Sequence, residues 1–194
     1  MDPTKREATD AELVARARGG EVSAFGELLR RHQRAVYGVV SRMVDDRDDV
    51  DDIVQDVFVL ACRSIDRFRG DSAFSTWLYR IAVNTTIKQM KKIKIRRSAS
   101  IDDPDTGLGD TLVASDCNDP EEEAQRRARS QALREAIETL PEKHREVVML
   151  HYFQNCSCDE IANATGCSVG TVWSRLHYAC KKLQGQLKWL AAEG

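Results

Sequence analysis

The feature that most constrains the fold is a break in the hydrophobic pattern near the middle of the chain. Residues 98–123 are rich in Asp, Gly, Ser, Thr and Pro and show little periodicity, and residues 101–125 contain nine acidic residues and no Lys or Arg. A segment of this composition does not bury enough apolar surface to fold by itself. It therefore predicts a flexible acidic linker that divides the 194-residue chain into two small domains, 10–97 and 124–190.

Apolar residues on both sides of this segment repeat with the spacing of amphipathic helices. In the first domain, stripes at i, i+3, i+4 and i+7 run along residues 10–17, 25–43, 50–61 and 74–81. Each stripe needs a partner to cover it, and the neighbouring helices supply one. In the second domain, similar stripes run along residues 124–140, 147–152 and 161–176. The sequence therefore predicts an all-α fold of two small helical domains.

A helix-turn-helix pattern occupies residues 157–176. Ser157 followed by Glu160 has the form of a capping box, which starts a helix, and Gly166 lies in the turn that follows. A second helix starts near Val169, and its polar face would enter the major groove of DNA. The positions on that groove face are Thr171, Ser174, Arg175 and Tyr178, and those expected to point inward are Ile161, Ala162, Val169, Val172 and Leu176.

The net charge of −2 conceals an uneven distribution along the chain. Residues 1–100 contain 19 Lys and Arg against 15 Asp and Glu, and residues 126–194 contain ten against seven. The helix that begins near Phe74 ends with six basic residues and no acid in the ten positions 88–97. Such a density of positive charge attracts phosphates. Two mildly basic domains joined by an acidic linker are typical of a nucleic-acid-binding protein.

The sequence argues against several other classes of protein. It has no run of roughly 18 apolar residues and no signal peptide, which predicts a cytoplasmic protein. Its six cysteines come without any sign of an oxidising compartment, so we expect free thiols. Cys156 and Cys158 leave zinc binding as an alternative, although one intervening residue is not the usual zinc spacing. His144 and His151 lack a carboxylate at a catalytic spacing, so we expect no enzyme, no metal and no cofactor.

Three motifs, taken in order along the chain, resemble those of bacterial sigma factors of the extracytoplasmic-function (ECF, group four) type. Residues 49–58 resemble the core-binding region 2.2, and residues 74–85 resemble regions 2.3 and 2.4. Residues 140–150 and 161–175 resemble region 4. The resemblance covers nearly the whole chain. It implies a factor without chemistry of its own that directs RNA polymerase to promoters.

The resemblance assigns the polar face of the helix at 50–61 to core RNA polymerase. The residues implied to dock on the clamp helices of the β′ subunit are Asp52, Gln55 and Asp56. A face of carboxylates beside a packed apolar stripe suits an Arg-rich partner. A merely solvated acidic face is the alternative that the residues alone leave open.

By the same resemblance, the helix that begins at Phe74 recognises the minus-ten element and holds a base flipped out of the non-template strand. The residues implied to contact this DNA are Ser75, Thr76, Arg80, Asn84, Lys88 and Lys91. The last four fall along one side of the helix, as a track for single-stranded DNA requires. Asn84 matches the Asn of the family motif and is the first candidate for a base contact. Trp77 lies on the apolar stripe, which favours core packing over base stacking, and Tyr79 is left open.

The second helix of the helix-turn-helix would likewise enter the major groove of the minus-35 element. The residues implied to contact it are Ser168, Thr171, Ser174, Arg175, Tyr178, Lys181 and Lys182, the last two along the DNA backbone. Many relatives carry Arg at the position of Trp173, and a basic residue is frequent at that of Tyr178. Neither aromatic side chain makes the bidentate guanine contact of Arg, so a relative's minus-35 sequence does not transfer to this chain.

The resemblance also implies the partners: core RNA polymerase, through its β′ clamp helices and β flap, promoter DNA, and an anti-sigma factor that holds the protein inactive. We therefore predict a sigma factor that reads two promoter elements and aids DNA opening. One alternative is a conventional helix-turn-helix regulator, which would bind duplex DNA without polymerase. Another is a protein-binding adaptor whose basic helices are merely solvated.

Overall fold

The computed structural model describes residues 7–99 and 120–188. Over these residues the chain is helical, and none of them lies in a β-strand. The predicted all-α fold is confirmed. Residues 100–119, the central part of the expected acidic linker, lie outside the described residues. The two ends of that expected linker belong instead to the neighbouring helices, which reach Ala99 and start at Pro120.

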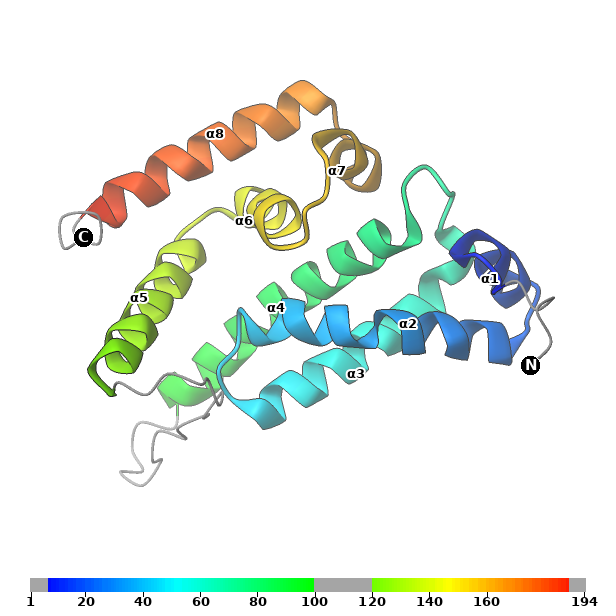
Figure 1. Ribbon diagram of the computed structural model, residues 1–194, viewed down its shortest axis with the longest axis horizontal. Coiled ribbons are helices and arrows are strands. Elements are labelled where there is room, and N and C mark those ends of the chain that lie inside the picture. The colour runs from blue at the N-terminus through cyan, green and yellow to red at the C-terminus, as the bar shows by residue number, and fades with distance from the viewer. Residues whose placement is uncertain (1–6, 100–119, 189–194) are drawn as a thin grey trace.

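The N-terminal helices form the first bundle, drawn in blue to green in Figure 1. They are α1 (Asp10–Arg18), α2 (Val22–Ser41), α3 (Arg47–Ser64), the short 3-10 helix η1 (Ile65–Arg67) and α4 (Phe74–Ala99). The buried residues of α3 are apolar and recur at helical spacing, as predicted: Val50, Ile53, Val54, Val57 and Ala61. These residues turn one face of α3 toward α2 and α4 and leave the acidic face outward.

A side-chain cap fixes where α1 begins. The capping residue of α1 is Thr9, because Thr9 and Glu12 together form a capping box. Asp10 instead accepts hydrogen bonds from Arg31 and His32 of α2, at 3.2 and 2.6 Å. Asp10 thus ties α1 to α2 rather than starting the helix.

The second bundle runs from yellow-green to red in Figure 1. Its elements are α5 (Pro120–Glu138), α6 (Glu142–Val148), the π-helical turn η2 (Met149–Phe153), α7 (Cys158–Thr165) and α8 (Val169–Gln186). The predicted capping box of Ser157 and Glu160 opens α7. Gly166 ends α7 at φ 68°, a left-handed conformation that glycine adopts without a Cβ penalty. Ser168 then caps α8.

The C-terminal end of α5 is held by cations from two other helices. Arg145 of α6 is buried and donates to the carbonyl oxygens of Glu138 and Leu140. Lys182 of α8 donates to the carbonyl oxygen of Thr139, at 2.7 Å. The last carbonyls of a helix have no partner within it, and positive groups there also favour the helix dipole. Arg145 and Lys182 therefore position α5 against α6 and α8.

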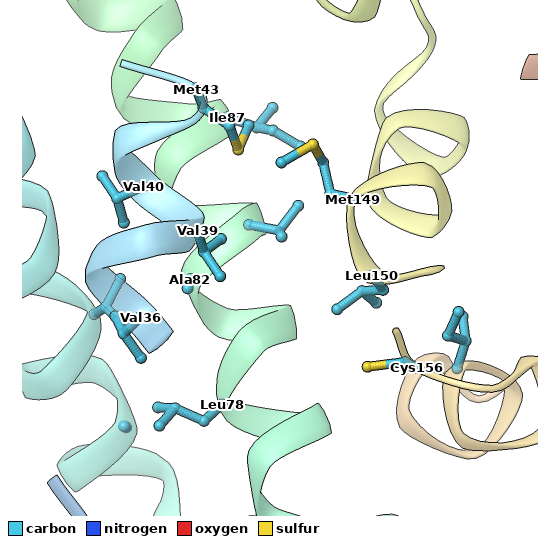
Figure 2. Close-up of a cluster of buried hydrophobic side chains, with 14 of the residues drawn as sticks. Val36, Val39, Val40, Met43, Leu78, Ala82, Ile87, Met149, Leu150 and Cys156 are labelled. Atoms are coloured by element: carbon cyan, nitrogen blue, oxygen red, sulfur yellow. The ribbon is translucent and has the colours of Figure 1, made fainter. Parts of the chain in front are cut away.

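The two bundles share one hydrophobic core rather than standing apart. α4 lies between α2 and α3 on one side and α6, η2 and α7 on the other. Figure 2 shows Met43 and Ile87 of the first bundle facing Met149 and Leu150 of the second. The sequence predicted two domains joined by a linker, and the packing of one against the other was not foreseen.

Candidate nucleic-acid interface

The helix-turn-helix places its predicted inward residues in the core. Ile161, Ala162, Val172 and Leu176 are buried, and Val169 is half-buried. On the opposite face of α8, Trp173 and Tyr178 are 61% and 48% exposed. Ser174 and Lys181 are exposed beside them, and Thr171 is half-buried. The face of α8 expected to read DNA is therefore open to solvent.

Several predicted DNA contacts on α8 also have partners within the protein. Ser168 Oγ caps Thr171 N at 3.2 Å, and Ser174 Oγ donates to the Thr171 carbonyl oxygen at 2.9 Å. Arg175 is half-buried and reaches the sulfur of Cys167 at 3.8 Å. Lys182, which was expected to follow the DNA backbone, also caps α5 with its ammonium. Its structural role arises from a contact 43 residues away in sequence, which local pattern does not predict.

Tyr178 packs against His144 of α6, with the two ring centroids 4.6 Å apart. Burial lowers the pKa of His144, and the nearby positive charges of Arg175 and Lys182 lower it further. The imidazole is therefore mainly neutral at pH 7, and its ring packs against that of Tyr178 at an interplanar angle of 53°. This contact fixes the direction in which one aromatic side chain leaves α8.

The outer face of α3 carries the three residues assigned to core polymerase. Asp52, Gln55 and Asp56 are all exposed. Asp56 also accepts a hydrogen bond from the Gln89 amide of α4, at 2.6 Å. Two large apolar side chains, Val59 and Leu60, are exposed one turn further along the same helix. The surface thus combines carboxylates with apolar area, a combination suited to a protein partner.

A groove of about 390 Å³ runs between the end of α3 and the middle of α4. Its lining includes four basic side chains, Arg63, Arg67, Arg80 and Lys88, and one aromatic ring, that of Trp77, together with Leu60, Ser64, Ile81, Asn84 and Thr85. The sequence predicted the contributors from α4 but missed Arg63 and Arg67. Arg63 and Arg67 come after the α3 motif and are four positions apart, so they lie on the same side of a helix. This spacing could have indicated a shared basic surface.

Trp77 both packs in the core and borders this groove. Its ring lies 5.3 Å from that of Phe68 and 5.5 Å from that of Phe74, between centroids. The predicted core packing is therefore present, and the half-buried indole still lines the groove. Tyr79 is also half-buried, and burial raises the pKa of its phenol.

Four of the six predicted minus-ten residues contact the second bundle. Arg80 Nε donates to Glu146 Oε1 at 3.1 Å, and Asn84 Nδ2 donates to the same oxygen at 2.9 Å. Lys91 pairs with Glu142 at 3.0 Å. Thr76 is only 2% exposed and lies 3.9 Å from Cys156 Sγ. The remaining two, Ser75 and Lys88, are half-buried and exposed respectively.

The cysteines among the described residues do not assemble a metal site. Cys156 and Cys158 are buried, and burial raises the pKa of the Cys156 thiol. Within residues 7–99 and 120–188, no group of three or more His, Cys, Asp or Glu side chains is placed to hold a metal ion. None of the helices in this part of the chain has the length and apolar character needed to cross a membrane.

Comparison with known proteins gives matches along both bundles. Residues 28–95 match the family model for sigma-70 region 2, and residues 130–183 match that for sigma-70 region 4. The RNA polymerase sigma-H factor of Pseudomonas aeruginosa is 35% identical over 188 residues, which cover 95% of this chain and 96% of that protein. The ECF RNA polymerase sigma-E factor of Escherichia coli K12 is 37% identical over 184 residues, covering 93% and 95% respectively.

Solved structures share the fold. CnrH, in complex with the cytosolic domain of CnrY, superposes with a TM-score of 0.60 at 28% identity, over 92% of this chain and 97% of that chain. The sigma factor RpoE of Bartonella quintana, in complex with the anti-sigma factor NepR, has a TM-score of 0.54 at 25% identity and covers 86% of this chain and 98% of its own.

The basic groove beside α4 and the helix-turn-helix of α7 and α8 are thus the two candidate nucleic-acid-binding regions of an all-α protein. With relatives this similar along nearly its whole length, the chain belongs to the sigma-70 family, among the ECF sigma factors.

Proposed function

We propose that the protein recruits core RNA polymerase to promoters by reading two DNA elements, one with each bundle, and that it aids the opening of the DNA between them. The observation that carries this proposal is the presence, on one chain of this family, of a basic, Trp-lined groove in the first bundle and a solvent-exposed recognition helix in the second. Sigma factors of this family initiate transcription without being enzymes. Its place of action is the cytoplasm, where its polymerase partner works.

The groove between α3 and α4 would hold the non-template strand of the minus-ten element. Arg63, Arg67 and Lys88 supply the positive track that a single-stranded backbone needs, and Trp77 supplies an aromatic wall. The Asn84 amide offers both a donor and an acceptor to the edge of a flipped base. Arg80, on the same wall, would pair with a phosphate.

The exposed face of α8 would enter the major groove of the minus-35 element. Trp173 cannot donate two parallel hydrogen bonds to guanine, but its apolar ring suits the methyl group of thymine. Ser174 and Arg175 would lie closest to base edges or phosphates, and Lys181 would lie along the backbone. The minus-35 sequence is therefore expected to differ from that of relatives with Arg at position 173.

The outer face of α3 would dock on core polymerase. Asp52, Gln55 and Asp56 would meet basic residues of the β′ clamp helices, and the apolar Val59 and Leu60 beside them would add buried area. Contact with the β flap would come from the second bundle. A relative, RpoE of Bartonella quintana, binds an anti-sigma factor, and we propose that this chain is also held inactive by such a protein.

Run-off transcription tests this function directly. Core polymerase is given a genomic promoter library with and without the full-length protein. We expect transcripts that depend on the protein and start from promoters sharing two spaced elements. Absence of such transcripts, together with tight binding of duplex DNA by the protein alone, would identify a conventional helix-turn-helix regulator instead.

A further inference from the structure

A cluster of aromatic rings connects the two walls of the groove between α3 and α4. Trp77, which lines the groove from α4, packs against Phe68 and Phe74, and the rings of these two phenylalanines are 5.9 Å apart between centroids. Phe68 directly follows Arg67, which belongs to the other wall, and Phe74 is the first residue of α4. Both phenylalanines are buried. The place of the indole in the groove therefore depends on where these two rings lie.

His32 of α2 is the polar member of this cluster. Its ring centroid lies 5.5 Å from that of Phe74 and 6.4 Å from that of Tyr79, at interplanar angles of 59° and 75°. Tilted and edge-on arrangements at such distances are the favoured ones for aromatic pairs. Only 13% of the His32 side chain is exposed. His32 thus packs against the first turns of α4 and limits where Phe74 can lie.

Asp10 of α1 holds this imidazole in one orientation. His32 Nε2 donates to Asp10 Oδ2 at 2.6 Å, a short hydrogen bond to a carboxylate. The other carboxylate oxygen, Oδ1, accepts from Arg31 Nη1 at 3.2 Å, and the same nitrogen donates to the carbonyl oxygen of Ala8 at 2.7 Å. These three hydrogen bonds join the start of α1 to α2.

The residue types at this contact favour positioning over plain packing. An apolar ring would fill the same space without the cost of taking an imidazole and a carboxylate partly out of water. The hydrogen bond adds direction, which apolar contacts lack. Successive contacts join Asp10 to His32, His32 to Phe74, and Phe74 to Trp77 in the wall of the groove. They begin on α1, a helix to which no DNA or polymerase contact has been assigned.

We propose that His32 is a positioning residue of the minus-ten reader. Held by Asp10, it fixes Phe74 at the start of α4 and, through Phe74, the indole of Trp77. This inference rests on the proposed function, in which Trp77 is the aromatic wall of the groove. A base stacks on an aromatic ring only when that ring lies at the right place and angle, so a displaced indole loses the contact. In this way α1 contributes to DNA reading without touching DNA.

The fluorescence of Trp77 tests the positioning without DNA. Trp173→Phe combined with Trp189→Phe leaves Trp77 as the only tryptophan of the chain. In this background, His32→Gln keeps an amide donor for the carboxylate but has no ring. We expect its emission to shift to longer wavelength and its acrylamide quenching constant to rise, whereas His32→Phe, which restores a ring, should recover most of the protection. The control is His151→Gln, the same change at a half-buried position of the second bundle, which should leave both signals unchanged.

DNA binding tests whether this placement matters for reading. The full-length chain, with its natural tryptophans, is bound to core polymerase, and the probe is fluorescein-labelled single-stranded DNA of randomised sequence, about 15 nucleotides long. Above the binding of core polymerase alone, His32→Gln should bind this probe about fivefold more weakly than the wild type, because stacking is lost. Added to Trp77→Leu, the same change should cost less than about twofold, since residues that act through one group are not additive. His32→Phe should again recover most of the affinity.

The outcomes separate this inference from the proposed function. If His32→Gln leaves the emission and quenching of Trp77 unchanged, the proposal is overturned even where run-off transcription succeeds. An equal loss of DNA affinity with and without Trp77 would also overturn it, because His32 would then act on the fold and not through the indole. If the wild-type complex does not bind the probe, the proposed function of the groove fails, and the role of His32 in reading fails with it.

A second variant keeps the test decisive if His32→Gln does not fold. Asp10→Ala removes the carboxylate that orients the imidazole, at a side chain that is 33% exposed, while Thr9 still caps α1. The emission, the quenching and the DNA affinity should change in the same direction as in His32→Gln, and by less, because the ring is retained. No change in any of the three would contradict the role of Asp10 and overturn the proposal.

Discussion

The two regions expected to read DNA differ in how far their side chains are exposed to solvent. On α8, Trp173, Ser174, Tyr178 and Lys181 face solvent. On α4, Thr76 is buried, and Arg80 and Asn84 are bonded to Glu146. The proposed recognition helix is therefore open to solvent, whereas three of the residues proposed to read the minus-ten element have partners in the second bundle. The difference shows that having the correct residues on the correct helix does not make a surface available.

The largest expected effect comes from the shared core. Leu150 of η2 is completely buried where the two bundles meet (Figure 2). Leu150→Ala should lower the free energy of unfolding by about 2–5 kcal/mol, because it removes buried methyl groups and leaves a cavity. Urea denaturation measures this loss. The control is Val22→Ala, at a position 83% exposed, for which the change should stay within about 0.5 kcal/mol. Equal effects would mean that the interface adds nothing to stability.

A second test concerns a surface that is exposed and lies away from the interface. The double change Gln55→Ala and Asp56→Ala should weaken binding to core polymerase by about 2 kcal/mol, since it removes polar partners of a basic surface. Fluorescence anisotropy with labelled protein gives the affinity. Gln33→Ala with Asp66→Ala, which alters exposed residues of the same types elsewhere in the first bundle, is the control. Unchanged affinity in the first double variant would place the docking surface elsewhere.

The minus-ten reader itself is tested by Asn84→Ala. We expect promoter opening to fall about tenfold, because the flipped base loses its amide contact, while binding to core polymerase stays unchanged. Permanganate reactivity of unpaired thymines reports the opening. Asn163→Ala, on the exposed side of α7, is the matched control. Normal opening by Asn84→Ala would assign the base contact to another residue of the groove.

The open recognition helix is tested by Arg175→Ala. If Arg175 contacts a base, affinity for the minus-35 duplex should fall by roughly 1–3 kcal/mol, and preference for that sequence should relax. A phosphate contact would cost less and would weaken binding to every duplex alike. Titration of one cognate and one scrambled duplex separates these two roles.

The smallest effect concerns His144 beneath Tyr178. Its pKa is lowered in the folded protein, so the unfolded chain binds a proton more readily. The resulting stability is full above the unfolded pKa of about 6.5 and is lost as pH falls toward the lower folded value. Unfolding curves between about pH 7 and pH 5 should therefore show less loss of stability in His144→Gln than in the wild type. An identical pH dependence would contradict the burial of this imidazole.

Much of each bundle could be predicted from local pattern. The apolar stripe of α3, the capping box at Ser157 and the turn at Gly166 all follow from residues within a few positions of one another. Such features depend on helix geometry alone, and a single sequence reveals them.

What the sequence did not predict depends on residues far apart in the chain. Glu146 lies 62 residues from Asn84 in the sequence. Because it belongs to a short polar helix, local pattern predicts a solvated side chain. Lys182 is a basic residue of the kind that contacts DNA, and it also caps the end of α5. Arg63 and Arg67 complete a groove whose other wall is on α4. In each case a charged side chain has a role set by a partner that periodicity does not identify.

A small cavity between the bundles is lined by Met43, Met90 and Met149, which are the only methionines among the described residues, together with Ile137, Arg42, Arg134, Glu138 and Arg145. Unbranched thioether side chains adapt their shape to many neighbours, unlike the β-branched residues that fill the core of the first bundle. Side chains of this kind accommodate small changes in the relative position of the two bundles. The contact between the two bundles at this cavity therefore tolerates changes in the surrounding side chains better than a core of β-branched residues would.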